Sequence, residues 1–130
     1  MNSENNNYNL KNVLSLAFLG DAVFTLMVRE WLLKNNDSKP NNLNKLANSV
    51  VKASYQAEIL RNLKDTLNEE ESDIVRRARN SHLNNIAKNS THEEYSLATQ
   101  LETLVGYWYL TEQKEKLDNM FKEFVEKKLC

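Results

Sequence analysis

Glycine and proline are nearly absent from this chain, whose 130 residues include two glycines and one proline. A β-sandwich or barrel needs turn residues about every ten positions, and long stretches of this chain have none. Clusters of asparagine at 2–12, 35–48 and 80–89 can serve as turns and helix caps instead. Because apolar residues between these clusters recur at helical spacing, the sequence predicts an all-α fold.

The most apolar stretch, residues 10–34, is expected to form two helices. Gly20 interrupts its apolar run, and Asp21 directly after the glycine is a good helix N-cap. We therefore predict a first helix that ends near Leu19 and a second that runs from about Asp21 to Lys34.

Further helices are predicted along the rest of the chain. Pro40 suits the first turn of a third helix, and the apolar pattern resumes from Ala53. Residues 1–9 are expected to form a polar tail on a single domain that spans residues 1–130. The remaining helices are predicted at about 69–79, 93–111 and 114–128, with a loop at 80–92.

Composition excludes several kinds of site. Two distant glycines exclude the glycine-rich loops that bind phosphates, and a single cysteine, Cys130, excludes a disulfide framework. His82 and His92 are too few and too badly spaced for a zincin-type metal site. The chain starts without an apolar signal segment, and no apolar run approaches the ~20 residues that cross a bilayer. We therefore expect a cytoplasmic protein.

Charge is missing from two apolar segments, apart from one carboxylate in each. Asp21 is the only charged residue within 12–28, and Glu102 is the only one within 95–111. An ionised carboxylate in such surroundings costs several kcal/mol unless a positive charge compensates it. Neither segment supplies an arginine or lysine, whereas Mg²⁺ binds through one or two carboxylates with waters and phosphate. The pattern therefore points to a metal ion shared by the two carboxylates.

The two glycines lie close to these carboxylates in the sequence. Gly20 precedes Asp21, and Gly106 lies four residues after Glu102. Because glycine has no side chain, two helices can approach closely at these positions and bring the carboxylates to one point.

Each carboxylate also has a purely structural interpretation. Asp21 could cap a helix after the glycine, and Glu102 could lie at the boundary of an amphipathic helix. Either explanation accounts for one carboxylate, but neither accounts for both. The polar face of that amphipathic helix would comprise Tyr95, Thr99, Glu102, Gly106 and Tyr109.

The formal net charge of −1 conceals a segregation of charge along the chain. Residues 38–57 and 74–92 contain lysines or arginines and no acid. Such segregation could give one basic face suited to the phosphates of a nucleic-acid duplex. The alternative is ordinary solvated charge, with the arginines complementing a helix C-terminus.

Several motifs resemble those of the ribonuclease III catalytic domain. Residues 17–23, AFLGDAV, resemble the signature of that family, and residues 101–107, LETLVGY, resemble its other acidic helix. The order and spacing of the motifs carry the resemblance, which covers about residues 10–120. Four further segments resemble motifs of the family's short branch, Mini-ribonuclease III. They are VKASYQA at 51–57, RRARN at 76–80, KN at 88–89 and YSLAT at 95–99.

The resemblance implies a helical-bundle homodimer that cleaves double-stranded RNA with Mg²⁺, or with Mn²⁺ as a substitute, and has no separate double-stranded-RNA-binding domain. Asp21 takes the place of the catalytic aspartate and Glu102 that of the metal-binding glutamate. Full-length members of the family have acidic residues where this chain has Ala17 and Thr99, and the short branch shares this departure.

The same resemblance suggests a substrate and its contacts. The branch is associated with maturation of the large-subunit (23S) ribosomal RNA precursor, and a ribosomal protein is a candidate helper. A-form RNA is bound mostly through its shape and backbone, so weak sequence preference is expected. The candidate backbone contacts are Lys52, Arg76, Arg77, Arg79 and Lys88, with Ser54 and Gln56 as weaker ones.

Two functions of other classes remain open from the sequence. A non-catalytic RNA-binding or scaffold protein could use the same fold, although retention of Asp21 and Glu102 argues against it. A helical protein-interaction module fits the near-neutral net charge, yet it gives no reason for the lone carboxylates.

Overall fold

The computed structural model describes residues 12–81 and 92–130, which are helical apart from short connections and contain no strand. The all-α prediction is confirmed. The predicted tail at 1–9 and most of the predicted loop at 80–92, with His82 and Lys88, lie outside the described residues. The helices are α2 (Val13–Asn35), α3 (Pro40–Val51), α4 (Ala53–Leu63), the short η2 (Lys64–Thr66), α5 (Glu69–Ser81), α6 (His92–Leu110), α7 (Lys114–Met120), the π-helical η4 (Phe121–Glu126) and α8 (Lys127–Leu129).

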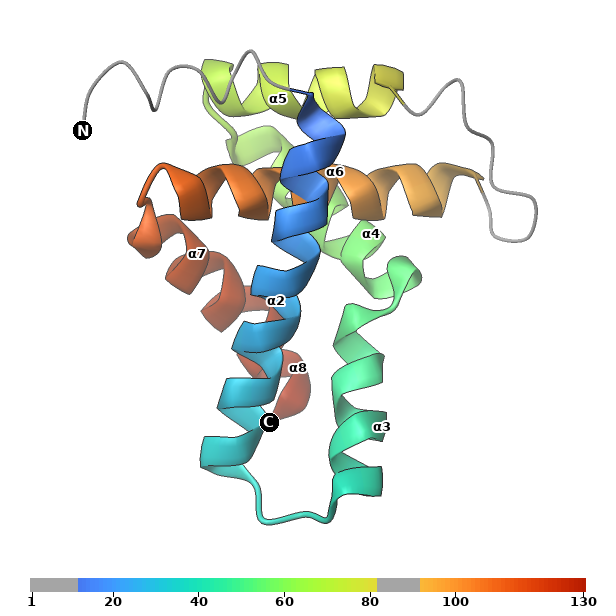
Figure 1. Cartoon of the computed structure of the whole chain (residues 1–130), viewed down its shortest axis with the longest axis vertical. Helices are drawn as coiled ribbons and strands as arrows, with labels where there is room; N and C mark the ends of the chain where they lie inside the picture. Colours follow the sequence, from blue (N-terminus) through green and yellow to red (C-terminus); the bar gives the residue numbers. More distant parts are fainter. Residues whose placement is uncertain (1–11, 82–91) are drawn as a thin grey trace.

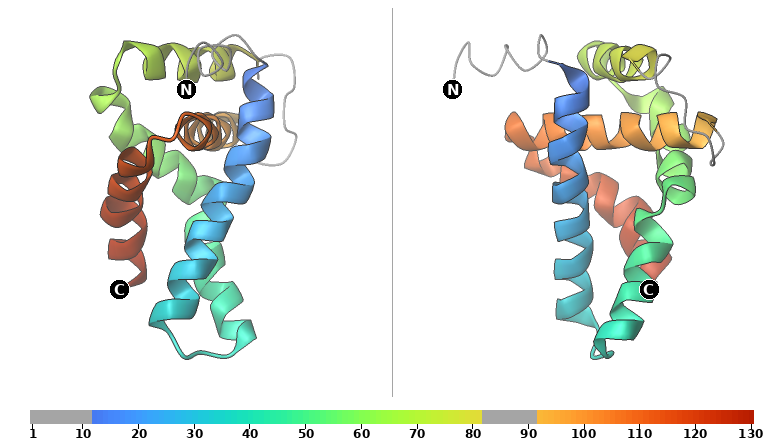
Figure 2. Two further views of the ribbon diagram at one scale, coloured as in Figure 1. Left: turned by 60° about the vertical axis from the view of Figure 1, so that its left-hand side comes forward. Right: turned by 45° about the vertical axis from the view of Figure 1, so that its right-hand side comes forward.

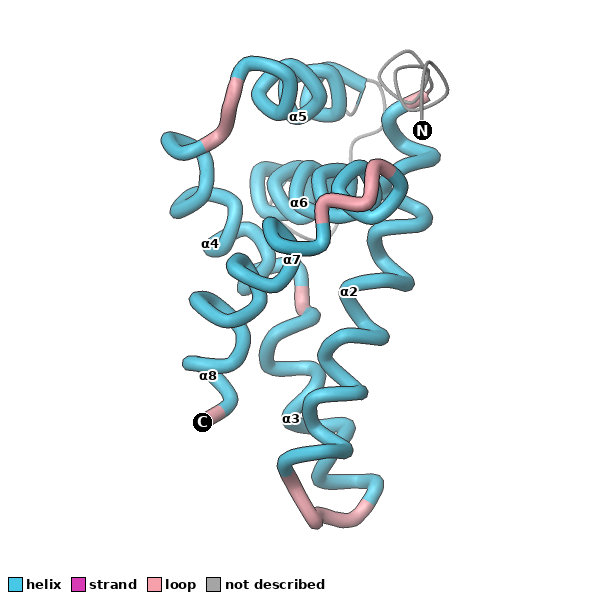
Figure 3. The backbone as a smooth tube through the Cα atoms, turned by 90° about the vertical axis from the view of Figure 1, so that its left-hand side faces the viewer, coloured by secondary structure: helices cyan, strands magenta, loops and turns pink. Residues whose placement is uncertain are grey.

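Helix α6 crosses α2 and forms the centre of the molecule (Figure 1). Helix α5 lies above α6 near the N-terminal end of α2, and α3 runs beside the C-terminal half of α2 (Figures 1 and 2). Helix α4 packs on α6, and the C-terminal segment α7–α8 descends from the end of α6 (Figure 3). Within the described residues, no helix is long and apolar enough to cross a membrane.

The apolar stretch at the start of the chain forms one helix, so the prediction of a break at Gly20 is wrong. Helix α2 continues through Gly20, and Asp21 lies in its interior. The N-cap is Asn12, whose side chain accepts a hydrogen bond of 2.9 Å from the Leu14 backbone N–H. A glycine inside a helix costs roughly 1 kcal/mol relative to alanine, and burial of Gly20 against α6 explains why the helix nevertheless persists. The interpretation of Asp21 as a helix cap is therefore excluded.

The other predicted helices are close to the observed ones. Pro40 opens α3, and Lys52, with extended dihedral angles, separates α3 from α4. The predicted helix at 114–128 is found, but its middle part, Phe121–Glu126, is π-helical, which the spacing of apolar residues does not reveal.

Burial along α6 is almost uninterrupted. Every residue from Leu97 to Trp108 is buried except Glu102, which is half-buried. A helix that is apolar on all sides belongs in a core, and here α2, α4 and α5 cover it. The one gap in this cover therefore lies at Glu102.

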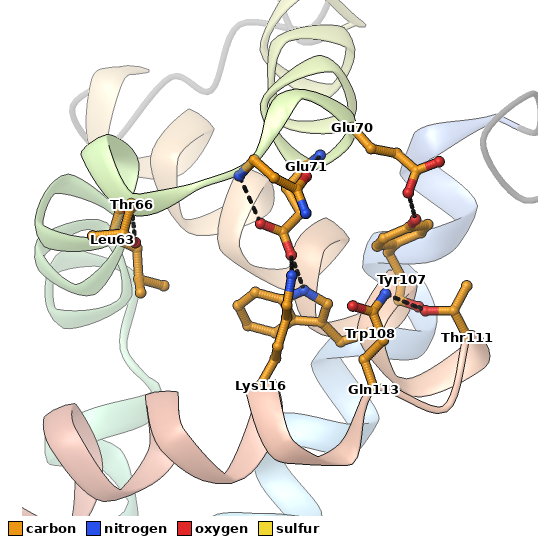
Figure 4. Close-up of polar contacts among 10 residues, drawn as sticks. Leu63, Thr66, Glu70, Glu71, Tyr107, Trp108, Thr111, Gln113 and Lys116 are labelled. Atoms are coloured by element: carbon orange, nitrogen blue, oxygen red, sulfur yellow. Dashed lines mark hydrogen bonds and ion pairs between the residues drawn. The ribbon is translucent and has the colours of Figure 1, made fainter.

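A network of hydrogen bonds anchors α5 to the C-terminal end of α6 (Figure 4). Asn68 and Glu71 cap the start of α5 reciprocally, each backbone N–H donating to the other's side chain, at 3.0 and 2.8 Å. The buried Glu71 carboxylate also accepts a hydrogen bond of 2.8 Å from Trp108 Nε1–H and pairs with Lys116. Tyr107 donates its hydroxyl hydrogen bond to Glu70 beside this network. Helix α5 is thus fixed relative to the central helix.

Candidate active site

The backbones of α2 and α6 touch where the helices cross. A Cβ atom built on Gly20 would lie 1.7 Å from the Glu102 carbonyl oxygen. One built on Gly106 would lie 2.1 Å from the Leu16 carbonyl oxygen. Real Cβ atoms never approach backbone so closely, so any side chain at either position would force the helices apart. The predicted close approach at the two glycines is confirmed.

This crossing brings the two lone carboxylates together. Asp21 follows the glycine of α2, and Glu102 is the residue whose backbone Gly20 contacts. The Asp21 carboxyl lies close enough to Glu102 to raise the pKa of that glutamate. Because Asp21 is exposed and Glu102 is half-buried, the pair forms a site that opens to solvent.

Asp21 and Glu102 form a negative site whose charge is not offset by a lysine or arginine among the described residues. Burial and the adjacent Asp21 carboxyl raise the pKa of Glu102 to about 8, and a hydrogen bond from the Gln56 amide opposes part of that rise. Within residues 12–81 and 92–130, no lysine or arginine forms an ion pair with either carboxyl. The pair therefore favours whatever brings positive charge to it, either a proton or a metal cation.

The donor set fits a small divalent cation. Carboxylate oxygens are the ligands that Mg²⁺ prefers, and Mg²⁺ usually keeps waters or phosphate oxygens in its remaining positions. Among the described residues, no third His, Cys, Asp or Glu joins the pair as a further ligand. A cation held here would thus have room in its coordination sphere for water and substrate.

The positions that are acidic in full-length members of the resembled family lie one helical turn before each carboxylate. Ala17 and Thr99 are both buried here. The Thr99 hydroxyl donates a hydrogen bond of 3.0 Å to the Tyr95 carbonyl oxygen within α6. Neither position adds a carboxylate to the site.

Three of the predicted RNA contacts lie at the start of helix α4, on two different sides of it. Lys52 and Ser54 are exposed at its start. Gln56 is only 3% exposed and lies close enough to Glu102 to lower the pKa of that glutamate. Sequence reasoning missed this role, although helical spacing contained a signal, since Gln56 shares the apolar spacing of Ala53, Ala57 and Leu60.

Helix α5 carries the three predicted arginine contacts near its C-terminal end. Arg76 and Arg79 are exposed, whereas Arg77 is half-buried. Arg76 forms an ion pair with Asp73 one turn earlier on the same helix. Lys88, the remaining predicted contact, lies outside the described residues.

Comparison with known proteins identifies the family. A model of the ribonuclease III domain matches residues 14–113, which include both carboxylates. The chain is 45% identical to Mini-ribonuclease 3 of Brevibacillus brevis over 109 residues, which cover 84% of this chain and 81% of the relative. It is 39% identical to Mini-ribonuclease 3 of Clostridium tetani over 112 residues, which cover 85% and 74% of the two chains.

A solved structure supports the same assignment. The crystal structure of a protein from Fusobacterium nucleatum matches with a TM-score of 0.82 and 32% sequence identity, covering 89% of this chain and 93% of the other. The chain therefore belongs to the ribonuclease III family of endoribonucleases. Within that family its relatives are the Mini-ribonuclease 3 proteins, the short branch that its sequence motifs indicated.

Proposed function

We propose that this protein hydrolyses phosphodiester bonds in double-stranded RNA, with Mg²⁺ held by Asp21 and Glu102. The observation that supports the proposal most directly is the pairing of these two carboxyls where α2 and α6 cross at Gly20 and Gly106, with no ion pair to a lysine or arginine of the described residues. Membership of the ribonuclease III family supplies the reaction class. Mn²⁺, which accepts the same oxygen ligands, is the expected substitute.

Asp21 and Glu102 differ in burial, and we assign them different roles on that basis. Glu102, half-buried on the central helix, is the fixed ligand, and it must release its proton when a cation binds. Asp21, exposed on α2, faces the solvent from which RNA arrives. The bound cation supplies an activated water and stabilises negative charge that develops on the phosphate. Within the described residues only these two carboxylates would hold the cation, which would leave coordination positions for phosphate oxygens of the RNA.

The RNA backbone is proposed to contact the exposed basic residues of α4 and α5. Lys52 caps the start of α4, and Ser54 lies two residues before Gln56, which is close enough to Glu102 to lower its pKa, so this end of α4 connects the site to the surface. Arg76, Arg77 and Arg79 lie on α5, which packs on the same central helix, and Lys88 follows them in the sequence. The motifs of the short branch make a 23S ribosomal RNA precursor, presented by a ribosomal protein, the proposed physiological substrate.

The proposed enzyme acts as a homodimer. Phe18 is 85% exposed on α2, Leu26 is exposed further along the same helix, and Tyr109 is exposed at the end of α6. These three side chains are candidates for burial against a second copy. Phe18 lies within one helical turn of Asp21, so such an interface would adjoin the site. Two-fold symmetry would then supply two sites for the two strands of a duplex.

A cleavage assay tests this function. Long double-stranded RNA is incubated with and without Mg²⁺ and with wild type, Asp21→Asn or Glu102→Gln. Asp65→Asn and Glu115→Gln, at exposed positions outside the site, are matched controls. We expect Mg²⁺-dependent fragments from wild type and both controls, and none from the two site variants, which should retain wild-type helical content. Equal cleavage by Asp21→Asn, or binding of RNA by wild type without any cleavage, would contradict the proposal.

A further inference from the structure

We propose that the C-terminal segment, which comprises α7, η4 and α8, holds α4 and α5 in the relative positions in which both helices contact the RNA backbone. Tyr55 on α4 and Lys116 on α7 are the positioning residues. The inference rests on the proposed function, because it concerns the two helices that carry the proposed RNA contacts. The C-terminal segment itself carries none of the proposed metal ligands or RNA contacts.

One contact of the C-terminal segment is made at the start of α5 (Figure 4). Lys116 on α7 pairs with the buried carboxylate of Glu71. The same carboxylate accepts a hydrogen bond of 2.8 Å from Trp108 Nε1–H on the central helix α6. Lys116 therefore reaches a buried point at which α5, α6 and α7 meet. Because hydrogen bonds are directional and apolar packing is not, these polar contacts fix the rotation of α5 about its axis.

The rotation of α5 determines where its arginines lie. Glu71 shares the buried stripe of this helix with three apolar residues, whereas Arg76 and Arg79 are exposed. The helix is continuous from Glu69 to Ser81, so a rotation at Glu71 would move both arginines with it. The pairing of Lys116 with Glu71 thus bears on the proposed RNA contacts of α5.

A second contact of the C-terminal segment is made at the start of α4. The Tyr55 hydroxyl donates a hydrogen bond of 2.6 Å to the Phe124 carbonyl oxygen, and Lys128 Nζ lies 5.3 Å from the centre of the Tyr55 ring. The acceptor lies in the π-helical η4, and π-helical turns are rare and frequent at functional sites. Tyr55 directly follows Ser54 and lies three residues after Lys52. The contact therefore anchors the turn that presents both proposed RNA contacts of α4.

The C-terminal segment is itself fixed to the rest of the protein. Its apolar side chains Leu117, Met120, Phe121 and Val125 are buried, and α7 packs against α6. The polar contacts at α4 and α5 therefore hold both helices relative to the central helix. Binding to a duplex neutralises several phosphates at once, so the gain from joint contacts is lost when geometry prevents both helices from engaging together.

The test separates position from charge by comparing two lysines of α7. Lys116→Met removes the contact with Glu71, and Lys114→Met removes the same charge at a residue that pairs with Asp118 on its own helix. Tyr55→Phe removes the hydroxyl hydrogen bond, keeps the ring and changes no charge. The Kd of a short fluorescein-labelled RNA duplex is measured by anisotropy without Mg²⁺ at several salt concentrations. The kcat at saturating RNA is measured with Mg²⁺.

We expect Lys116→Met and Tyr55→Phe each to raise the RNA Kd by about fivefold and to lower the slope of log K against log salt by about 1, as when one phosphate contact is lost. Their kcat at saturating RNA should equal that of wild type, and Lys114→Met should keep the wild-type Kd. A wild-type Kd in Tyr55→Phe, or equal weakening in Lys116→Met and Lys114→Met, would overturn the inference while the proposed function stands. Tyr55→Phe also tests the inference if Lys116→Met does not fold, since it leaves the Glu71 network intact.

A double-mutant cycle distinguishes positioning by Lys116 from direct contact between Lys116 and RNA. In a protein with Arg76, Arg77 and Arg79 replaced by Gln, Lys116→Met should cause no further rise in Kd, because it acts through those arginines. An additive rise would overturn the inference. If the arginine replacements leave the Kd unchanged, the proposed contacts of α5 fail and the inference fails with them. If wild type neither binds nor cleaves duplex RNA, the proposed function itself fails.

Discussion

Glu71 and Glu102 are both withdrawn from solvent, yet their surroundings shift their pKa values in opposite directions. Burial alone would raise the pKa of Glu71, but hydrogen bonds from Lys116, the Asn68 backbone and Trp108 lower it below its usual range. Burial and the Asp21 carboxyl raise the pKa of Glu102 to about 8. Groups of the protein thus stabilise the ionised carboxylate of Glu71, whereas the ionised carboxylate of Glu102 needs a bound cation to stabilise it. This difference separates a structural glutamate from a candidate metal ligand.

The largest expected effect comes from removing the negative partner of Glu102. Asp21→Asn takes away one of two cation ligands, and metal stabilisation of the reaction is worth several kcal/mol. We expect cleavage to fall by about 10³-fold, at 1.36 kcal/mol per factor of ten. The free energy of unfolding without Mg²⁺ should not decrease, since the substitution also relieves repulsion at Glu102. Single-turnover cleavage and urea unfolding measure the two quantities, and a destabilised but active variant would contradict the account.

The close approach of α2 and α6 at Gly20 and Gly106 sets the surroundings of Glu102 but not those of Glu71. Gly106→Ala places a methyl group 2.1 Å from the Leu16 carbonyl oxygen, so α2 and α6 must separate. We expect a loss of about 3 kcal/mol in the free energy of unfolding, measured in urea, together with loss of cleavage. Wild-type stability and activity in Gly106→Ala would show that the backbones need not touch.

The two glutamates should respond differently to the same substitution. Glu71→Gln removes the charge that pairs with Lys116 and accepts from Trp108, and it should lower the free energy of unfolding by about 2 kcal/mol. Glu102→Gln should not lower it when Mg²⁺ is absent, because no lysine or arginine within 12–81 and 92–130 forms an ion pair with Glu102. Urea unfolding of both variants without Mg²⁺ makes the comparison, and equal destabilisation would contradict it.

Much of this fold could be predicted from the sequence, because helical spacing and caps are local signals. The break predicted at Gly20 failed because a glycine followed by aspartate normally marks a helix boundary, whereas contact with α6 here overrides that preference. The carboxylate pair could be predicted because both residues lack charged neighbours. The Glu71 network could not be predicted, since Trp108 and Lys116 lie far along the chain and only tertiary packing brings them to Glu71.

The smallest expected effect is on the acid stability of the protein. Because the pKa of Glu71 is lowered in the folded state, its contribution to stability is present above the unfolded-state pKa of about 4.3 and is lost as pH falls through the folded-state value. Lys116 pairs with Glu71, and Glu70, with Tyr107, is the other ionisable neighbour. Unfolding at pH 6 and pH 3 should show a smaller loss of stability in Glu71→Gln than in wild type. An equal loss of stability in both proteins would show that groups other than Glu71 cause the acid sensitivity.

Calorimetric titration of Mg²⁺ into wild type, Asp21→Asn, Glu102→Gln and Glu71→Gln tests most directly whether the charge of Glu102 is left for a cation. We expect binding to be lost in Asp21→Asn and Glu102→Gln and to be retained in Glu71→Gln, measured where that variant remains folded. Mg²⁺ binding that persists unchanged in both Asp21→Asn and Glu102→Gln would contradict it.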